Sequence, residues 1–280
     1  MIGSLAGLLR RAWRHPSGRI GTAILLILVL TAVIGPAFLA DPVVMPDVVA
    51  GATPPSAAHP LGTDHLNRDV LSRVVNGARV SLTVAALAVL LALTVGAAVG
   101  LIAGYFGGWI DALLMRVVDA ALAIPRLFVL LLLLVVWERI PLYALVLVLG
   151  TTGWFATSRL VRGEVLRLKQ EPFVTAAIAL GAGSWRMITR HLLPNAAGPV
   201  LVAATLGVGD VILLESGLSF LGLGIQPPTP SWGGMVLDAR PLLLSAPWTA
   251  IFPGAAIVVT VLAVNLVGDA LSAALDPRSA

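Results

Sequence analysis

Long apolar stretches, separated by charged or proline-containing segments, dominate the sequence. Six of them approach or exceed the roughly 20 residues that an α-helix needs to cross the hydrocarbon core of a bilayer. They occupy residues 20–40, 80–104, 112–137, 141–157, 198–222 and 248–272. Pro125 and Arg126 interrupt the third stretch, and proline disfavours the interior of a helix. The pattern predicts an all-α membrane protein with six transmembrane helices.

The composition excludes a soluble domain. Hydrophobic residues make up 58% of the 280 residues and charged residues only 11%, whereas soluble domains carry about a quarter charged residues. The absence of cysteine excludes zinc-ribbon, iron–sulfur and thiol-nucleophile chemistry. The four histidines are not spaced as a metal site: His15, His59, His65 and His191. The sequence therefore predicts neither a metal site nor an enzymatic activity in this chain.

The lysine content bears on the energy source. The only lysine, Lys169, precedes Gln170, whereas a phosphate-binding P-loop requires Gly-Lys followed by Ser or Thr. We therefore expect no ATP hydrolysis by this chain. Energy for any transport would come from an ion gradient or from another subunit.

Basic residues predict the orientation in the membrane. They concentrate before the first span, at Arg10, Arg11, Arg14 and Arg19, and between the fourth and fifth spans, from Arg159 to Arg190. The positive-inside rule puts such segments in the cytoplasm, together with both termini. The basic charge thus reflects membrane topology and not nucleic-acid binding.

This topology divides the chain into two parts. Residues 1–79 would hold the cytoplasmic tail, the first helix and an external loop, and residues 80–280 a core of five helices with a cytoplasmic loop over 158–197. A second external segment, 223–247, contains Trp232 and several prolines, which stiffen the backbone. We expect this segment and residues 61–79 to face the outside.

The cytoplasmic loop carries the most distinctive pattern. Pro172 suits the first turn of a helix and Gly181 its left-handed end, so a helix of a few turns is predicted between them. Its apolar positions follow a mixed helical spacing: Phe173, Val174, Ala177, Ile178 and Leu180. A second short helix over 185–193 would end at Pro194. The residues alone allow two interpretations: docking into a groove of another protein, or rest on lipid headgroups.

A resemblance decides between these interpretations. The cytoplasmic loop resembles the EAA loop of bacterial ABC importer permeases. The residues that carry this resemblance are Thr175-Ala176-Ala177, followed by Gly181 and by His191-Leu192-Leu193-Pro194. Further segments resemble the dipeptide/oligopeptide/nickel branch of that family, and in particular its C-type subunit. They are LGTDHLNRDVLSRVVNGARVSL (61–82), GYFGGWIDALLMRVVDAALAIP (104–125), LLESGLSFLGLGIQPPTPSWGGM (213–235) and GDALSAALDPR (268–278). The resemblance covers nearly the whole chain.

Three positions depart from the pattern of the family. Thr175 stands where a glutamate is common, Asn67 replaces a usual glycine, and Ser158 replaces a usual alanine. None of these changes removes the short helix. The Thr175 departure means that no glutamate contact to an ATPase can be assigned at that position.

The resemblance implies a type I ABC importer permease fold, in which the short helix of the loop is a coupling helix that lies in a cleft of an ATPase subunit. The implied partners are a second homologous permease (as a heterodimer), two cytoplasmic ATPase subunits that bind ATP and Mg, an external solute-binding protein and the lipid bilayer. The implied location is the bacterial cytoplasmic membrane. The expected ATPase-coupling residues are Glu171, Phe173, Val174, Thr175, Ala176, Ala177, Leu180, Gly181, His191, Leu193 and Pro194.

Polar groups inside the predicted spans are the other candidates. Charge in hydrocarbon is costly, so such residues face the interior, where they pair or line a path. They are Asp119, Arg126, Asp210 and Glu215. Helical rise places Arg126 and Asp210 roughly 15 and 22 Å from their membrane surface, so we expect them to neutralise one another, with Asp119 as the rival partner of Arg126.

Small residues predict helix packing. Gly96, Gly100 and Gly104 recur every four residues and form a stripe that allows two helices to approach closely. We also expect close packing at Gly207 and Gly209.

The sequence thus favours a permease subunit of an ATP-driven importer for peptides or similar solutes. Two alternatives belong to other classes. One is an ion-coupled secondary transporter that uses the buried acids for protons, and the other is a membrane scaffold without transport.

Overall fold

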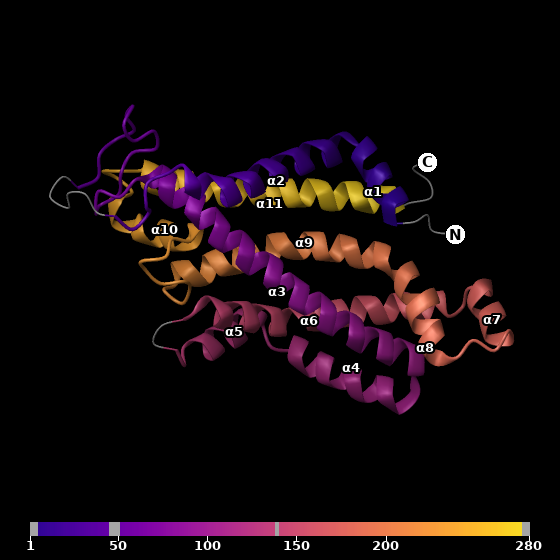
Figure 1. Ribbon diagram of the computed structural model, residues 1–280. Helices are drawn as coiled ribbons and strands as arrows, with labels where there is room; N and C mark the ends of the chain where they lie inside the picture. Colours follow the sequence, from indigo (N-terminus) through magenta and orange to yellow (C-terminus); the bar gives the residue numbers. More distant parts are fainter. Residues whose placement is uncertain (1–4, 45–50, 138–139, 276–280) are drawn as a thin grey trace.

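A computed structural model describes residues 5–44, 51–137 and 140–275. In these residues the chain is an elongated bundle of helices (Figure 1) with a single isolated β-bridge, between Thr63 and Asp69. The longer helices are α1 (Leu5–Arg14), α2 (Pro16–Ile34), α3 (Val70–Phe106), α4 (Gly108–Leu122), α5 (Arg126–Leu134), α6 (Leu142–Leu168), α7 (Pro172–Ala179), α9 (Leu193–Phe220), α10 (Trp232–Asp238) and α11 (Trp248–Leu275). The shorter turns are η1 (Gly35–Ala37), α8 (Ser184–Arg186), η3 (Met187–Leu192) and η4 (Arg240–Leu242).

Five helical segments in the described residues are long and apolar enough to cross a membrane. The sixth predicted span exists only as the bent pair α4 and α5, whose axes differ by 80°. Pro125 lies at the break as the N-cap residue of α5, because proline cannot donate the backbone hydrogen bond that a continuous helix requires. The predicted interruption at Pro125 and Arg126 is confirmed, and the all-α membrane fold with it.

Helix α3 begins at Val70 rather than at the predicted residue 80. The Asp69 carboxylate caps its first turn by accepting hydrogen bonds from the backbone N–H groups of Leu71, at 2.7 Å, and Ser72, at 3.3 Å. Such a cap satisfies donors that have no partner within the helix. The expected boundary between residues 79 and 80 therefore falls inside α3, and part of the segment expected as an external loop is helical.

Pro194 does not end a helix, contrary to the prediction. Residues 184–220 form one continuous helical segment, in which η3 is a π-helical turn that ends at Leu192, two residues before Pro194. A π-turn changes the hydrogen-bond register locally, and the side-chain amide of Asn195 donates to the carbonyl of His191 at 2.6 Å. The wider turn and this side-chain bond accommodate the proline at the start of α9.

The glycine stripe of α3 packs against α6, and these two helices make the most extensive helix–helix contact in the bundle. A Cβ atom on Gly96 would lie 2.6 Å from Thr157, one on Gly100 2.6 Å from the carbonyl oxygen of Ser158, and one on Gly104 2.8 Å from Val165. The predicted close packing is confirmed there. At Gly207 and Gly209 an added Cβ would make ordinary van der Waals contacts at 3.8 and 3.7 Å, so the packing there does not require glycine.

The two ends of the bundle are built differently. Three segments lie at one end of the bundle (Figure 1): helix α7, helix α1 and the end of α11. Helix α10 and the chain around residues 51–69 cover the other end. This arrangement matches the predicted placement of the two termini on the same side as the loop 158–197.

The close contact at Gly100 generates the first prediction. The Gly100→Ala substitution should lower the thermal stability of the purified chain, because a methyl group cannot fit 2.6 Å from a backbone oxygen without separating the two helices, and such overpacking costs about 1–3 kcal/mol. Gly254→Ala in α11 is the matched control, since nothing lies within 4 Å of that added carbon. It should be neutral or stabilising, because alanine is the better helix former by about 1 kcal/mol. Equal unfolding temperatures for the two variants in the same detergent would contradict this account.

Candidate functional site

Helix α7 is attached to the bundle by one face. Val174 is only 1% exposed and packs in a cluster with Leu168 of α6 and Met187 of η3. Ala177, one helical turn further, packs against the same cluster. These two residues, expected to contact an ATPase, therefore face inward and position the helix.

The opposite side of this loop is open and apolar. Leu180 is 89% exposed, Trp185 78% and Ile178 58%, and Phe173, Thr175 and Ala176 are exposed as well. Large apolar side chains that gather at the exposed end of a protein mark a surface that meets a partner. We call Phe173, Ile178, Leu180 and Trp185 the apolar loop surface.

Local sequence explains the shape of the loop. Glu171 adopts an extended backbone as the N-cap residue of α7, and Pro172 supplies the first turn, as predicted. Gly181 has a φ of +79°, a conformation that glycine adopts without a steric penalty. Leu180 is the C-cap residue between them, so the predicted start and end of this helix are confirmed.

Ionic contacts fix the base of the loop. The Lys169 ammonium donates to the carbonyl oxygens of Tyr105, at 2.8 Å, and Gly104, at 3.3 Å, at the end of α3, where a cation is favoured by the helix dipole. The Glu171 carboxylate accepts a hydrogen bond from Arg167 at 3.0 Å. Glu171, expected to contact an ATPase, thus has a partner within the loop itself.

The remaining predicted coupling residues lie at the junction of η3 and α9. Leu193 is 43% exposed, Pro194 is exposed and His191 is half-buried. Two nearby residues of η3, Met187 and Leu192, are fully buried. The contact of the three predicted coupling residues with an ATPase stays a prediction.

A second candidate site is a cavity of about 180 Å³ between four helices. Helices α3, α5, α6 and α9 line it, mostly with small or apolar residues, and its charged groups are Arg126 and Asp210. The backbone passes close to the guanidinium at Gly153, where an added Cβ would lie 3.2 Å from Arg126. A cavity that holds one cation and one anion between four helices has the polarity expected of a path for solutes.

The expected direct pairing of Arg126 with Asp210 does not form. Arg126 donates instead to the carbonyl oxygen of Leu149 at 2.7 Å and to the hydroxyl of Thr152 at 3.2 Å. Asp210 lies on the same cavity, interacts electrostatically with Arg126 and is exposed on α9. The two groups therefore share one cavity, and among the described residues no carboxylate is within 4.0 Å of the guanidinium.

Asp119 is not a partner of Arg126. It forms an ion pair with Arg159 of α6, and both side chains are 51% exposed. One turn further along α6, Arg162 binds both carboxylate oxygens of Asp111, at 2.5 and 2.6 Å. These pairs join α4 to α6 (Figure 1), so Asp119 has the interhelical role that the sequence left open.

Glu215 lies among serines and is only 1% exposed. Its carboxylate accepts hydrogen bonds from Ser219, at 2.8 Å, and from Ser81 of α3, at 3.3 Å. The Ser81 hydroxyl also accepts from the backbone N–H of Trp232 at 3.3 Å. Glu215 therefore ties α9 to α3 and α10, and does not line the cavity with Arg126.

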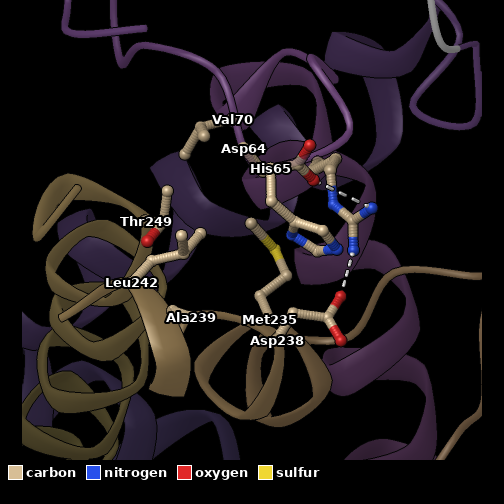
Figure 2. A pocket seen from close by; sticks show the side chains of 9 residues that line it. Asp64, His65, Val70, Met235, Asp238, Ala239, Leu242 and Thr249 are labelled. Carbon is tan, nitrogen blue, oxygen red and sulfur yellow. Dashed lines mark hydrogen bonds and ion pairs between the residues drawn. The ribbon is translucent and has the colours of Figure 1, made fainter. Parts of the chain in front are cut away.

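A buried ionic cluster closes the other end of the bundle. Asp64 binds Arg68 at 2.7 Å and Arg73 at 3.4 Å, and Asp238 of α10 binds Arg73 at 3.1 Å and Arg68 at 3.6 Å. Figure 2 shows Asp64 and Asp238 on opposite sides of one guanidinium, with His65 and Met235 beside it. Both arginines are almost fully buried. Two cations and two anions balance one another, so the cluster fastens α10 to the start of α3.

Sequence reasoning missed this cluster, although Asp64, Arg68 and Arg73 lie within one short, charge-balanced segment. It expected the segment with Trp232 on the external side of the membrane, but it did not predict that this side chain is buried within the bundle. Trp232 is 0% exposed and donates from its indole N–H to the carbonyl of Val74 at 2.9 Å. Ser231 is buried too. The segment covers the end of the bundle, and its tryptophan holds it in place.

The chain thus has the architecture of a multi-pass, all-α membrane permease, with a structured apolar loop at one end of its bundle and a closed ionic cluster at the other. Residues 96–280 match the family described as the binding-protein-dependent transport system inner membrane component. The chain belongs to this family. Membership makes it the membrane component of a transport system that also includes a binding protein and an ATPase.

Relatives with similar sequences carry related names. The chain is 42% identical to a dipeptide transport system permease protein of Bacillus subtilis, over 96% of this chain and 84% of the relative. It is 39% identical to an oligopeptide transport system permease protein of the same organism, over 92% and 85%. A glutathione transport system permease protein of Pectobacterium atrosepticum is 41% identical, over 80% and 74%.

The shared cavity generates a prediction about Arg126 and Asp210. Asp210→Asn and Arg126→Gln should each destabilise the chain, and the double variant should recover part of the loss. Contacting or electrostatically linked residues show coupling energies of about 0.5–3 kcal/mol in such a cycle. The measurement is chemical or thermal unfolding of the four proteins in one detergent.

The control cycle uses Asp119→Asn and Arg159→Gln. That pair is half-exposed, and exposed pairs are worth about 0.2–1 kcal/mol. If the losses from Arg126→Gln and Asp210→Asn simply add, the two residues are not coupled.

Proposed function

We propose that this chain is one of two different permease subunits in an ATP-driven importer for peptides or similar solutes. It would pair with a homologous permease, two ATPase subunits on the cytoplasmic side and an external solute-binding protein. ATP and Mg would bind to the ATPase subunits. The printed names of the relatives, which include dipeptide, oligopeptide and glutathione transport, support this substrate class.

The proposal rests on one observation: this member of the transport family exposes the apolar loop surface at one end of its helical bundle. Leu180 and Trp185 are among the most exposed large apolar residues of the described chain. Their transfer from water into a protein groove would contribute about 25 cal/mol per Å² of apolar area. The inner face of α7 is already packed against the bundle, so a partner can bind the outer face while the helix keeps its place.

The mechanism proposed is alternating access. Closure of the two ATPases on ATP would move the α7 helices of both permeases. Val174 transmits such a displacement to a cluster that contains Leu101 of α3, Val165 of α6 and Ala196 of α9. Three spanning helices would therefore respond together, and the two permeases would open toward the other side of the membrane.

We propose that the cavity lined by Arg126 and Asp210 is a segment of the path along which the solute crosses the membrane. An exposed carboxylate in the middle of a span is costly against lipid, so the face of α9 with Asp210 should meet water or the second permease. Peptides carry an ammonium and a carboxylate group, and a cavity with one charge of each sign offers a counter-charge to both. Asp119 and Glu215 serve to join helices in this proposal.

The orientation puts α7, α1 and the end of α11 in the cytoplasm. The Arg10–Arg19 region and the Arg159–Arg190 region lie at this end, which agrees with the positive-inside rule. Helix α10 and the buried ionic cluster would then cover the external mouth, where the binding protein would dock.

Reconstitution tests the function. With all subunits in proteoliposomes, uptake of a labelled dipeptide or oligopeptide should require ATP and the binding protein, and a proton gradient without ATP should give none. The Leu180→Asp substitution should prevent co-purification of the ATPase subunits, because a carboxylate cannot be desolvated in an apolar groove without a cost of several kcal/mol. Leu244→Asp is the matched control, since Leu244 is 101% exposed and lies between η4 and α11, away from α7. It should keep the ATPases bound.

Two outcomes would contradict the proposal. Uptake driven by the proton gradient alone would favour an ion-coupled transporter. Normal ATPase association of the Leu180→Asp variant would remove the docking role of α7 even where uptake depends on ATP.

The orientation has its own prediction. Leu244→Cys in this cysteine-free chain should react with a membrane-impermeant thiol reagent added to intact cells, because its side chain is fully exposed. Gln170→Cys, exposed between α6 and α7, should react only after permeabilisation. The reverse labelling pattern would invert the topology.

A further inference from the structure

Helix α1 divides its surface into three stripes. Leu8 and Ala12, 2% and 7% exposed, pack against α11. At about 100° per residue, Leu9 and Trp13 form the next stripe, and they are 49% and 54% exposed. The third stripe is basic and exposed: Arg10, Arg11 and Arg14. A helix with an open apolar stripe beside a basic stripe is typical of one that lies in the membrane interface.

A cavity of about 530 Å³ opens beside this helix. Its lining consists of three basic residues from α1 and its end, together with Pro16 and small residues of α11: Arg11, Arg14, His15, Pro16, Ala270, Ala273 and Ala274. Among the described residues, no carboxylate lines it and none forms an ion pair with Arg11 or Arg14. Two guanidinium groups facing one cavity favour an anion with several acceptor oxygens.

The start of α2 adds to the positive potential. Pro16 is the first residue of this 19-residue helix and lines the cavity. The N-terminus of a helix carries a partial positive charge, which favours a phosphate. This contribution comes from the backbone and is independent of the arginines. The C-terminal ends of α1 and α11 at the same cavity carry partial negative charges, so the two arginines supply most of the attraction.

The surface next to the cavity indicates where the phosphate comes from. Only 11% of the spanning window of α2 is buried, the lowest share among the described spans. Its outer side chains are apolar and exposed, as at Ile20 (55%), Ile27 (60%) and Val33 (67%). Acyl chains can lie along this surface and along Leu9 and Trp13. A lipid in that position would carry its headgroup to Arg11 and Arg14.

We propose that the cavity between α1, the start of α2 and the end of α11 binds the headgroup of an anionic phospholipid in the leaflet on the α7 side. The phosphate accepts hydrogen bonds from Arg11 and Arg14, and the acyl chains cover the open side of α2. The bound lipid fixes α1 against α11. This site depends neither on the transported solute nor on the contact between α7 and an ATPase.

The experiment uses the full chain, purified in a neutral detergent with phosphatidylcholine and titrated with phosphatidylglycerol. Lipid retention is measured by native mass spectrometry, and the unfolding temperature is measured on the same samples. Phosphatidylglycerol should be retained and should raise the unfolding temperature, and phosphatidylcholine should do neither. Arg11→Gln with Arg14→Gln should weaken retention by roughly 30-fold, since each basic residue near an anionic lipid contributes roughly fivefold.

The control removes equal charge outside the cavity. Arg10→Gln with Arg19→Gln changes two exposed arginines that do not line it, and retention should stay within about threefold of the unchanged chain. Arg11→Lys with Arg14→Lys preserves the charge and should bind in between, because lysine lacks the bidentate fork of arginine. This variant keeps the test decisive if the glutamine variant fails to fold.

Three results would overturn the proposal. Equal losses for the two glutamine pairs would mean diffuse attraction to the surface. Equal stabilisation by inorganic phosphate or glycerol phosphate at matched concentration would mean a soluble anion. No retention of phosphatidylglycerol by the unchanged chain would mean that the arginines have another counter-charge, such as Asp276, which lies outside the described residues.

Discussion

The close approach of α3 to α6 sets the geometry on which the other helices depend. Three glycines let the two backbones meet, with Gly100 facing the carbonyl of Ser158. In a bilayer, apolar side chains gain little by leaving lipid, so helices are held by packing and by polar contacts. The α3–α6 pair supplies the packing over several turns. Helices α4 and α5 are then attached to one side of it and α9 to another, and the cavity with Arg126 and Asp210 lies where they meet.

Charged groups inside the bundle are placed by a second constraint, since each must find a partner away from lipid. Arg126 satisfies its donors on Leu149 and Thr152, Glu215 accepts from serines of two helices, and Asp119 pairs with Arg159. The buried Arg68 and Arg73 balance two aspartates. Each of these contacts also joins two segments of the chain. The free-energy cost of burying a charge is therefore offset by contacts that fix how the helices are arranged. Asp210 differs because it is exposed on α9, and the proposed path therefore follows its face.

Several features could be predicted from the sequence because each depends on local chemistry. They are the spans, the break at Pro125, the stripe of Gly96, Gly100 and Gly104, and the start and end of α7. The errors and omissions arose where the outcome depends on distant residues. Pro194 is tolerated only because a π-turn and Asn195 rearrange the hydrogen bonds around it. Trp232 is buried because α3 provides a carbonyl for its indole. The partner of Asp119 lies on α6, and no spacing along α4 could have indicated it.

The length of α3 connects the two ends of the bundle. Its 37 residues span roughly 55 Å at 1.5 Å per residue. Near its start Arg73 belongs to the ionic cluster with Asp238, and at its end the carbonyls of Gly104 and Tyr105 bind Lys169 at the base of the α7 loop. A rigid helix fixed at both ends moves as a unit and does not bend in the middle. If α7 were displaced, α3 would carry that displacement to α10, because neither end of α3 can yield without breaking a charged contact. The same helix thus joins the covered end to the open loop and lines the cavity with Arg126 and Asp210.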